Sequence, residues 1–449
     1  MTYNGNTQTR PDHASIDSRD SVELKRVVSS AALGQFVEWY DFVIYAYSAT
    51  VIAGLFFPSA DPTAALLSAL AVYGVGFLMR PLGGVVFGYL GDSIGRRNTL
   101  SVIILLMGGA TVAIGLLPTY EQIGILAPIL LVICRLVQGL SAAGEATGSN
   151  SFVAEHAPPN RRGFLVAFTY AFANLPPIVA ALLVLFITNV LTPEDYKSWG
   201  WRIPFLLGAP LALVGLYIRR RTEESPAFRK MRATKGVEAM PLRMAFRDYK
   251  KAMGFSFALA ALSSLGFYTL TGYFVTYLTV TVGLNRNDAL ISNSVALLIA
   301  FFAMLLGGHL SDKIGRRTTI LLGAAISALI CIPAYMLAGE GSLANAILGQ
   351  ALLACALGVF FGPVGIAFLE LFPTRIRLSG AGVSYNVAYT VFGGTAPLLS
   401  AFLVLQTGNK LAPAFYMAAV SVAVLIVALY LPETYQRSLV HPEDEIQTP

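Results

Sequence analysis

Two carboxylic acids stand close together in the first long apolar run of the sequence. Glu38 and Asp41 are three residues apart, so a helix would place both on one face. Two carboxylates in a medium of low dielectric cannot both be ionised at low energetic cost, so at least one is expected to hold a proton near neutral pH. We interpret the pair as a candidate proton-coupling site, with Glu38 as the first choice and Asp41 as the second. The alternative is that both stay ionised and pair with buried arginines.

Two arginines also lie within long apolar runs. Arg80 stands in the stretch MRPLGG and Arg135 in CRLVQG, and no lysine occupies the middle of such a run. The planar guanidinium binds a carboxylate through two parallel hydrogen bonds, which a lysine cannot do. Both arginines are therefore candidate ligands for an anionic substrate group. The alternative for each is a structural brace.

Aromatic and amide side chains form a third group of candidates. Aromatic faces hold quaternary ammonium groups by cation–π contact, and hydroxyl or amide groups orient a polar substrate. Aromatic residues at helical spacing more often belong to the core, which is the alternative here. The candidate substrate-binding residues of this group are Trp39, Tyr268, Tyr273, Tyr385 and Asn386.

The sequence repeats itself at two motifs. GYLGDSIGRR at 88–97 recurs as GHLSDKIGRR at 308–317, an offset of 220. FVAEHAPPNRRG and FLELFPTRIRLSG align at an offset of 215, which pairs Glu155 with Glu370 and Arg162 with Arg377. Two motifs at nearly one offset indicate duplication of a unit, and parallel duplicated halves are typical of membrane transporters.

The repeated charges predict a gate at one end of the helices. Glycines allow helix ends to approach closely, an aspartate can cap a helix N-terminus, and an arginine can bind a glutamate. Such contacts would hold one end closed in one state and break in another, whereas the alternative is a purely structural turn. The candidate gate residues are Gly88, Asp92, Gly95, Arg96, Arg97, Glu145, Glu155, Arg162, Asp312, Gly315, Arg316, Arg317, Glu370 and Arg377.

The elements that would position these side chains are membrane-spanning helices. Of the 449 residues, 55% are hydrophobic and only 12% charged, about half the charge of a typical soluble domain. Twelve apolar runs are long enough to cross a bilayer as helices. They cover about 27–53, 64–90, 99–117, 124–148, 164–189, 203–218, 252–281, 289–310, 319–338, 343–369, 378–405 and 412–431.

The basic residues predict how these runs are oriented. Of the 31 lysines and arginines, 25 lie at one set of run ends and 4 at the other. This bias places both termini in the cytoplasm and explains the net charge of +6 without a nucleic-acid partner. We therefore expect a cytoplasmic tail at 1–26, a six-helix bundle at 27–218, a cytoplasmic linker at 219–251, a second six-helix bundle at 252–431 and a cytoplasmic tail at 432–449.

The doubled loop motif resembles the signature of the major facilitator superfamily. More narrowly, the chain is similar to its metabolite:proton symporter family, which includes permeases for proline and betaine, 2-oxoglutarate, citrate and shikimate. The resemblance is carried by FVEWYDF (36–42), FLMRPLGGVVFGYLGD (77–92), CRLVQGLSAAGE (134–145), FVAEHAPPNRRGF (152–164) and WGWRIPF (199–205). It implies an all-α fold of two six-helix halves in the cytoplasmic membrane and transport driven by protons.

We expect a symporter that imports a small organic acid with a proton by alternating access, and not an enzyme. The first alternative is a proton symporter of a zwitterionic osmolyte such as proline or glycine betaine, and the weaker ones are a non-transporting sensor and a drug exporter. No phosphate-binding loop and no cluster of histidines and cysteines stands in the sequence, so we expect neither a cofactor nor a metal. The expected partners are the substrate, protons and the lipid bilayer, and the expected functional unit is a monomer.

Overall fold

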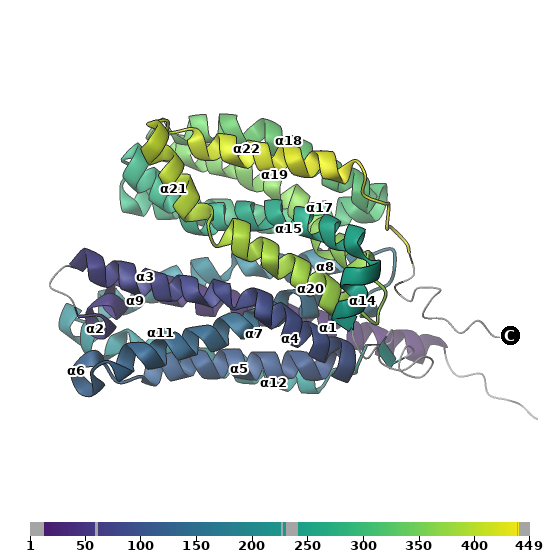
Figure 1. The fold of residues 1–449 in the computed structure, drawn as a ribbon, viewed down its shortest axis with the longest axis horizontal. Coiled ribbons are helices and arrows are strands. Elements are labelled where there is room, and N and C mark those ends of the chain that lie inside the picture. The colour runs from purple at the N-terminus through teal and green to yellow at the C-terminus, as the bar shows by residue number, and fades with distance from the viewer. Residues whose placement is uncertain (1–12, 59–61, 226–227, 230–240, 438, 440–449) are drawn as a thin grey trace, which may run out of the picture.

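Two helical bundles lie side by side in the structure (Figure 1). This computed structural model describes residues 13–58, 62–225, 228–229, 241–437 and 439. The all-α architecture of two halves confirms the predicted fold class. Residues 1–12 and 440–449 of the predicted tails, and residues 226–227 and 230–240 of the predicted linker, lie outside the described residues.

The first bundle, the N-half, contains the chain as far as Arg220. Its helices are α1 (His13–Tyr47), α2 (Ala49–Phe56), α3 (Pro62–Leu78), α4 (Arg80–Ile94), α5 (Arg96–Leu116), α6 (Tyr120–Ile123), α7 (Leu126–His156), α8 (Arg162–Ala171), the 3₁₀ turn η1 (Phe172–Asn174), α9 (Pro176–Val190), α10 (Pro193–Asp195), the π-helical η2 (Tyr196–Gly200), α11 (Arg202–Leu206) and α12 (Gly208–Arg220).

The second bundle, the C-half, follows the short amphipathic helix α14 (Pro241–Asp248). Its helices are α15 (Lys250–Tyr268), η3 (Thr269–Tyr273), α16 (Phe274–Thr276), η4 (Tyr277–Val282), α17 (Arg286–Ile314), α18 (Arg316–Ala338), α19 (Leu343–Glu370), α20 (Arg377–Ala388), η5 (Tyr389–Gly393), α21 (Ala396–Thr407) and α22 (Ala412–Ala428). The segments η3, η4 and η5 are π-helical, a wide turn that often occurs at functional sites.

The helices follow the predicted runs closely. In the described part of the chain, ten helical stretches are long and apolar enough to cross a bilayer. Residues Val22–Tyr47 and Ala49–Phe56 form an eleventh that is bent by 63°. The 17-residue helix α22 occupies the position of the twelfth predicted run.

Several helix ends differ from the prediction, among them the start of α1 and the end of α12. Helix α1 begins at His13, so the second half of the predicted N-terminal tail is helical and not irregular. Its polar residues extend an existing helix, and elongation is far less costly than nucleation. Helix α12 continues to Arg220, two residues into the predicted linker, and Arg219 is buried in the N-half.

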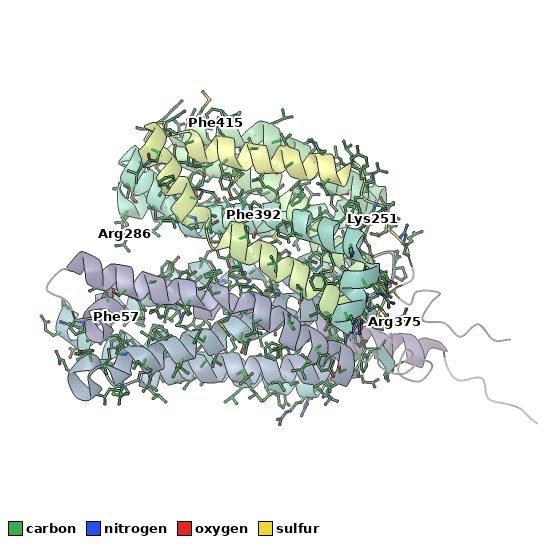
Figure 2. All side chains as sticks on the ribbon, in the orientation of Figure 1. Phe57, Lys251, Arg286, Arg375, Phe392 and Phe415 are labelled. Atoms are coloured by element: carbon green, nitrogen blue, oxygen red, sulfur yellow. The ribbon has the colours of Figure 1, made fainter. Side chains whose placement is uncertain are left out.

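The two ends of the bundles differ in charge. Lys251 and Arg375 lie at one end of the bundles, on the right of the view, whereas Phe57 lies at the opposite end (Figure 2). The former end carries the basic loops of the sequence, and we call it the cytoplasmic end because positive charge favours that side of a bilayer.

Candidate substrate site and cytoplasmic gate

Glu38 and Arg80 form an ion pair in the middle of the N-half. Glu38 Oε1 lies 3.1 Å from Arg80 Nη2, and both side chains are fully buried. The second carboxylate oxygen, Oε2, makes no hydrogen bond with any residue that the structure describes. The first predicted proton carrier is therefore held by the first predicted anion ligand.

Pro81 determines where Arg80 lies. Proline has no N–H, so the carbonyl of Phe77, four residues earlier, loses its helical partner, and the helix breaks between α3 and α4 at Met79. The hydroxyl of Thr390, from the C-half, lies 3.0 Å from this carbonyl oxygen. Arg80 begins the new helix at this break, so its side chain emerges where the two halves meet.

The Arg80 guanidinium lies among aromatic rings from both halves. Its Cζ is 5.9 Å from the ring centroid of Trp39, 5.8 Å from that of Phe42 and 5.4 Å from that of Tyr389. Arg80 Nε donates to Asn386 Oδ1 at 3.3 Å, whereas Nη1 makes no hydrogen bond within the described part of the chain. Two nitrogens are thus engaged and one is free.

Other polar atoms beside this guanidinium also lack partners. Tyr268 lies 5.7 Å from Trp39 between ring centroids, and Tyr385 stacks on Tyr389 at 4.0 Å. Trp39 Nε1 and the hydroxyls of Tyr268 and Tyr385 are buried without a hydrogen-bond partner among the described residues. Buried polar groups normally find partners, so this set is suited to contact a polar ligand or water.

Asp41 and Arg135 lie in a separate cluster within the N-half. Asp41 is fully buried, and its charged or polar neighbours are Thr111, Arg135 and Glu38. Arg135 donates to Gln138 Oε1 at 2.8 Å, and its Cζ lies 4.4 Å from the ring centroid of Tyr45.

Phe42 and Tyr73 also lie within 5.1 Å of the Arg135 guanidinium, which they enclose together with Tyr45. A guanidinium enclosed by three rings of its own half resembles a packing brace more than a ligand. Tyr273 packs on Tyr277 in the C-half, with ring centroids 6.2 Å apart, and the structure defines no contact that brings it to Arg80.

Glu145 forms an ion pair that sequence reasoning missed. Arg219 binds both of its oxygens, with Nη1–Oε2 at 2.9 Å, and Ser149 donates to it at 2.5 Å. Arg219 had been counted among the basic linker residues. This pair joins α7 to α12 within the N-half, whereas the other predicted gate charges are near the junction of the halves.

The first gate motif caps a helix of the opposite half. Asp92 accepts hydrogen bonds from the backbone N–H groups of Leu378, at 3.2 Å, and Ser379, at 2.8 Å, in the first turn of α20. Arg96 lies 3.3 Å from Asp92 and 3.3 Å from Glu155. Glu155 in turn pairs with Arg377 of the C-half at 2.6 Å, so the charges form one connected network.

The second gate motif repeats this arrangement in the opposite direction. Asp312 of the C-half accepts from the backbone N–H groups of Gly163, at 2.9 Å, and Phe164, at 2.7 Å, in the first turn of α8. Arg316 pairs with Asp312 at 2.6 Å and with Glu370 at 3.4 Å. Arg162 of the N-half lies 3.6 Å from Glu370, which completes the same network by symmetry.

Two glutamates brace the motifs within each half. Glu224 accepts from the backbone N–H groups of Arg96 and Arg97, and Glu433 from those of Arg316 and Arg317. Gly95 and Gly315, with φ of 100° and 95°, separate the paired helices in a conformation that side chains disfavour. Sequence reasoning missed both glutamates, although each follows the last helix of its half.

The hydrogen bonds and ion pairs that the structure defines between the halves lie between mid-helix and the cytoplasmic end. Arg80–Asn386 and Phe77–Thr390 are at mid-helix, and the two capped helices are at the end. Figure 1 shows α20 leaning from the upper bundle onto the lower one at this end. These contacts hold the two halves together at the cytoplasmic end.

Comparison with known proteins agrees with this architecture. The family described as "Sugar (and other) transporter" matches residues 27–445. The "Proline/betaine transporter" of Escherichia coli (strain K12) is 34% identical over 430 residues, which cover 94% of this chain and 86% of that protein. The "Glycine betaine/proline/ectoine/pipecolic acid transporter OusA" of Dickeya dadantii (strain 3937) is also 34% identical over 430 residues, or 94% and 85% of the two chains.

A solved structure shows the same fold. The major facilitator superfamily proton:xylose symporter XylE, bound to 6-bromo-6-deoxy-D-glucose, superposes with a TM-score of 0.80 over 94% of this chain and 98% of that one, at 18% identity. The predicted resemblance to the major facilitator superfamily is confirmed, and the protein is a multi-pass membrane transporter and not an enzyme. The chain belongs to the sugar (and other) transporter family, and it has the fold of a major facilitator superfamily symporter.

Proposed function

We propose that this protein imports a small zwitterion of the proline and betaine class together with a proton. The observation that supports this most directly is the buried guanidinium of Arg80, which keeps Nη1 free among aromatic rings where the two halves meet. The substrate carboxylate would bind this guanidinium. The cationic nitrogen of the substrate would lie against the faces of neighbouring rings such as Trp39 and Tyr268.

The names of the relatives support a zwitterion over the organic acid that the sequence first suggested. Glycine betaine, proline, ectoine and pipecolic acid each carry one carboxylate and one cationic nitrogen group. One arginine with a free nitrogen and several aromatic rings suit that combination. A dicarboxylate would favour two cations where the halves meet, and the second arginine, Arg135, is enclosed by rings of the N-half and bonded to Gln138.

Coupling to protons would follow from competition for Arg80. A substrate carboxylate that takes Arg80 Nη2 displaces Glu38, and an ionised carboxylate without a counter-ion is costly in the membrane interior. Glu38 would therefore take up a proton as the substrate binds. Asp41 remains the second candidate carrier, because it is a fully buried carboxylic acid in the same helix.

The two halves would alternate access by rocking about this central site. Asp92 and Asp312, with the arginines and glutamates around them, would hold the cytoplasmic end closed and release it in the inward-facing state. We keep the proposed bundles at 27–218 and 252–431 as the two moving units, with 219–251 as the cytoplasmic linker between them.

The test is uptake into vesicles that contain only this protein. Labelled glycine betaine, proline and 2-oxoglutarate are offered with an imposed pH gradient, acidic outside, and separately with a sodium gradient. We expect glycine betaine or proline to accumulate with the pH gradient alone. Accumulation of 2-oxoglutarate alone would return the substrate to the organic-acid class, and accumulation that needs sodium would refute proton coupling.

A further inference from the structure

Asn386 joins the two halves at the level of Arg80. Its carbonyl oxygen accepts from Arg80 Nε at 3.3 Å, and its amide nitrogen donates to the carbonyls of Ala143 and Gly382, both at 2.8 Å. Arg80 and Ala143 belong to the N-half, whereas Gly382 is one turn away on the same helix. The side chain is fully buried, and both of its N–H groups already have acceptors. Asn386 therefore has no donor left to offer a substrate.

The fold itself does not require this contact. The gate motif aligns Arg80 with Ala300 at the offset of 220, and the second motif aligns Asn386 with Ala171 at the offset of 215. Both alanines are buried where α8 packs against α17, and we call this contact and that of α4 with α20 the two seams between the halves. Asp312 caps α8 at the end of one seam, as Asp92 caps α20 at the end of the other. One of two symmetric seams thus carries a polar pair where the other carries two alanines.

We propose that Asn386 is a latch that holds the two halves together only while Arg80 carries no substrate. The inference depends on the proposed function, because it takes Arg80 as the carboxylate ligand. Arg80 has one free nitrogen, Nη1, and a carboxylate that binds it as a fork takes Nη2, which now holds Glu38, as the second nitrogen and draws the guanidinium away from Asn386. Movement of the guanidinium toward the substrate lengthens a contact with Asn386 that already measures 3.3 Å.

The seam below Arg80 transmits this loss to the gate. Arg80, Gly84, Gly88 and Asp92 lie at intervals of four along α4, so they share one helix face over about 18 Å. A Cβ at Gly84 would lie 3.0 Å from the Gly382 carbonyl oxygen, and one at Gly88 would lie 2.9 Å from Ser379 Cα. Backbones this close cannot shift past each other by small steps, so the seam separates as a unit.

Two substitutions distinguish a latch from a substrate ligand. Asn386→Ala frees Arg80 Nε and removes both links to the N-half, so the latch predicts a looser gate and, because substrate no longer has to break these links, an affinity that rises and does not fall. Asn386→Asp places a second carboxylate on Arg80, so the latch predicts a loss of affinity of at least tenfold, or about 1.4 kcal/mol. A substrate ligand would instead lose affinity in both variants.

The state of the gate is measured by the labelling of a cysteine introduced at a buried position. Val166 is fully buried and faces Gly365 of the other half near the cytoplasmic end, and it touches neither Arg80 nor Asn386. In a protein whose native cysteines are replaced by serine, Val166→Cys is labelled by a membrane-impermeant maleimide in inside-out vesicles. Glycine betaine affinity is measured on the same preparations by equilibrium binding.

We expect Asn386→Ala to raise the labelling rate without substrate by about tenfold, the effect of losing hydrogen bonds worth about 1.5 kcal/mol. Glycine betaine should raise labelling in the parent protein and add little in Asn386→Ala. Unchanged labelling in Asn386→Ala, or a tenfold loss of its affinity, would overturn the latch. Labelling without substrate is informative even if no zwitterion binds, so failure of the proposed function is seen separately.

Asn174→Ala is the matched control. Asn174 donates to Met304 Sδ at 3.2 Å across the symmetric seam, but it makes no hydrogen bond to Arg80. If Asn386→Ala acted only by loosening the packing between the halves, Asn174→Ala would remove the response to glycine betaine as well. We expect that response to persist in Asn174→Ala.

Discussion

Replacing Asp92 by asparagine removes a charge from the first gate motif while keeping the size of the side chain. Asp92 accepts two backbone N–H groups at the start of α20 and lies 3.3 Å from Arg96. An asparagine oxygen can accept one of these N–H groups, but its NH₂ group then faces the other donor. Arg96 keeps Glu155 as a partner, so the main loss is at the helix N-terminus.

The size of the effect follows from the contacts that break. A hydrogen bond to a charged group contributes about 1.5–3 kcal/mol, and a carboxylate at a helix N-terminus up to about 2 kcal/mol. We therefore expect Asp92→Asn to destabilise the closed conformation by about 2–3 kcal/mol relative to the open one. Because every 1.4 kcal/mol is a factor of ten, the equilibrium should move about 30- to 150-fold toward a gate open to the cytoplasm.

The assay pairs Val166→Cys labelling with uptake kinetics. In Asp92→Asn we expect faster labelling without substrate and a lower maximal rate of uptake, with substrate affinity changed less than the rate. Glu224→Gln is the matched control, because Glu224 caps α5 within the same half and its contacts survive a rocking motion. Labelling and uptake in Asp92→Asn at parent levels would show that the capped helix does not hold the gate.

Three further predictions concern the buried charges. Arg80→Lys should weaken glycine betaine binding by about tenfold or more, because the guanidinium fork is lost, whereas Arg135→Lys should change binding little. Equal losses of affinity in the two variants would make both arginines substrate ligands. Glu38→Gln should abolish accumulation driven by a pH gradient but preserve counterflow of substrate in the same vesicles; accumulation against a gradient would exclude Glu38 as the carrier. Glu145→Gln should lower the free energy of unfolding by about 3–5 kcal/mol, because Arg219 stays buried without a counter-ion. In the double variant, Arg219→Met should restore part of this stability.

Much of the fold could be predicted because the bilayer limits what a chain can do. Its thickness limits the length of each helix, and the duplicated motifs indicate two halves. The helix ends were less predictable. Val22–Phe56 bends at Ser48, where no proline or glycine marks the break, and α1 extends into polar sequence as far as His13.

The candidate site was harder to predict because its contacts join distant parts of the chain. Arg80 and Asn386 are 306 residues apart, and the pattern of one helix does not show which face of another it meets. Arg219 looked like one more basic loop residue until its partner Glu145 was placed. Tyr170 was also missed, although the offset of 215 pairs it with Tyr385 and the structure brings its hydroxyl to that of Tyr389.

The central claim is that a substrate carboxylate and Glu38 compete for Arg80, so binding should carry a proton into the protein. The most direct measurement adds saturating glycine betaine to the purified protein in weakly buffered solution near neutral pH and follows a pH indicator. We predict that the solution becomes more alkaline as the parent protein binds substrate. In Glu38→Gln, binding should persist while the pH change disappears. Binding without proton uptake in the parent protein, or proton uptake that is undiminished in Glu38→Gln, would contradict the account.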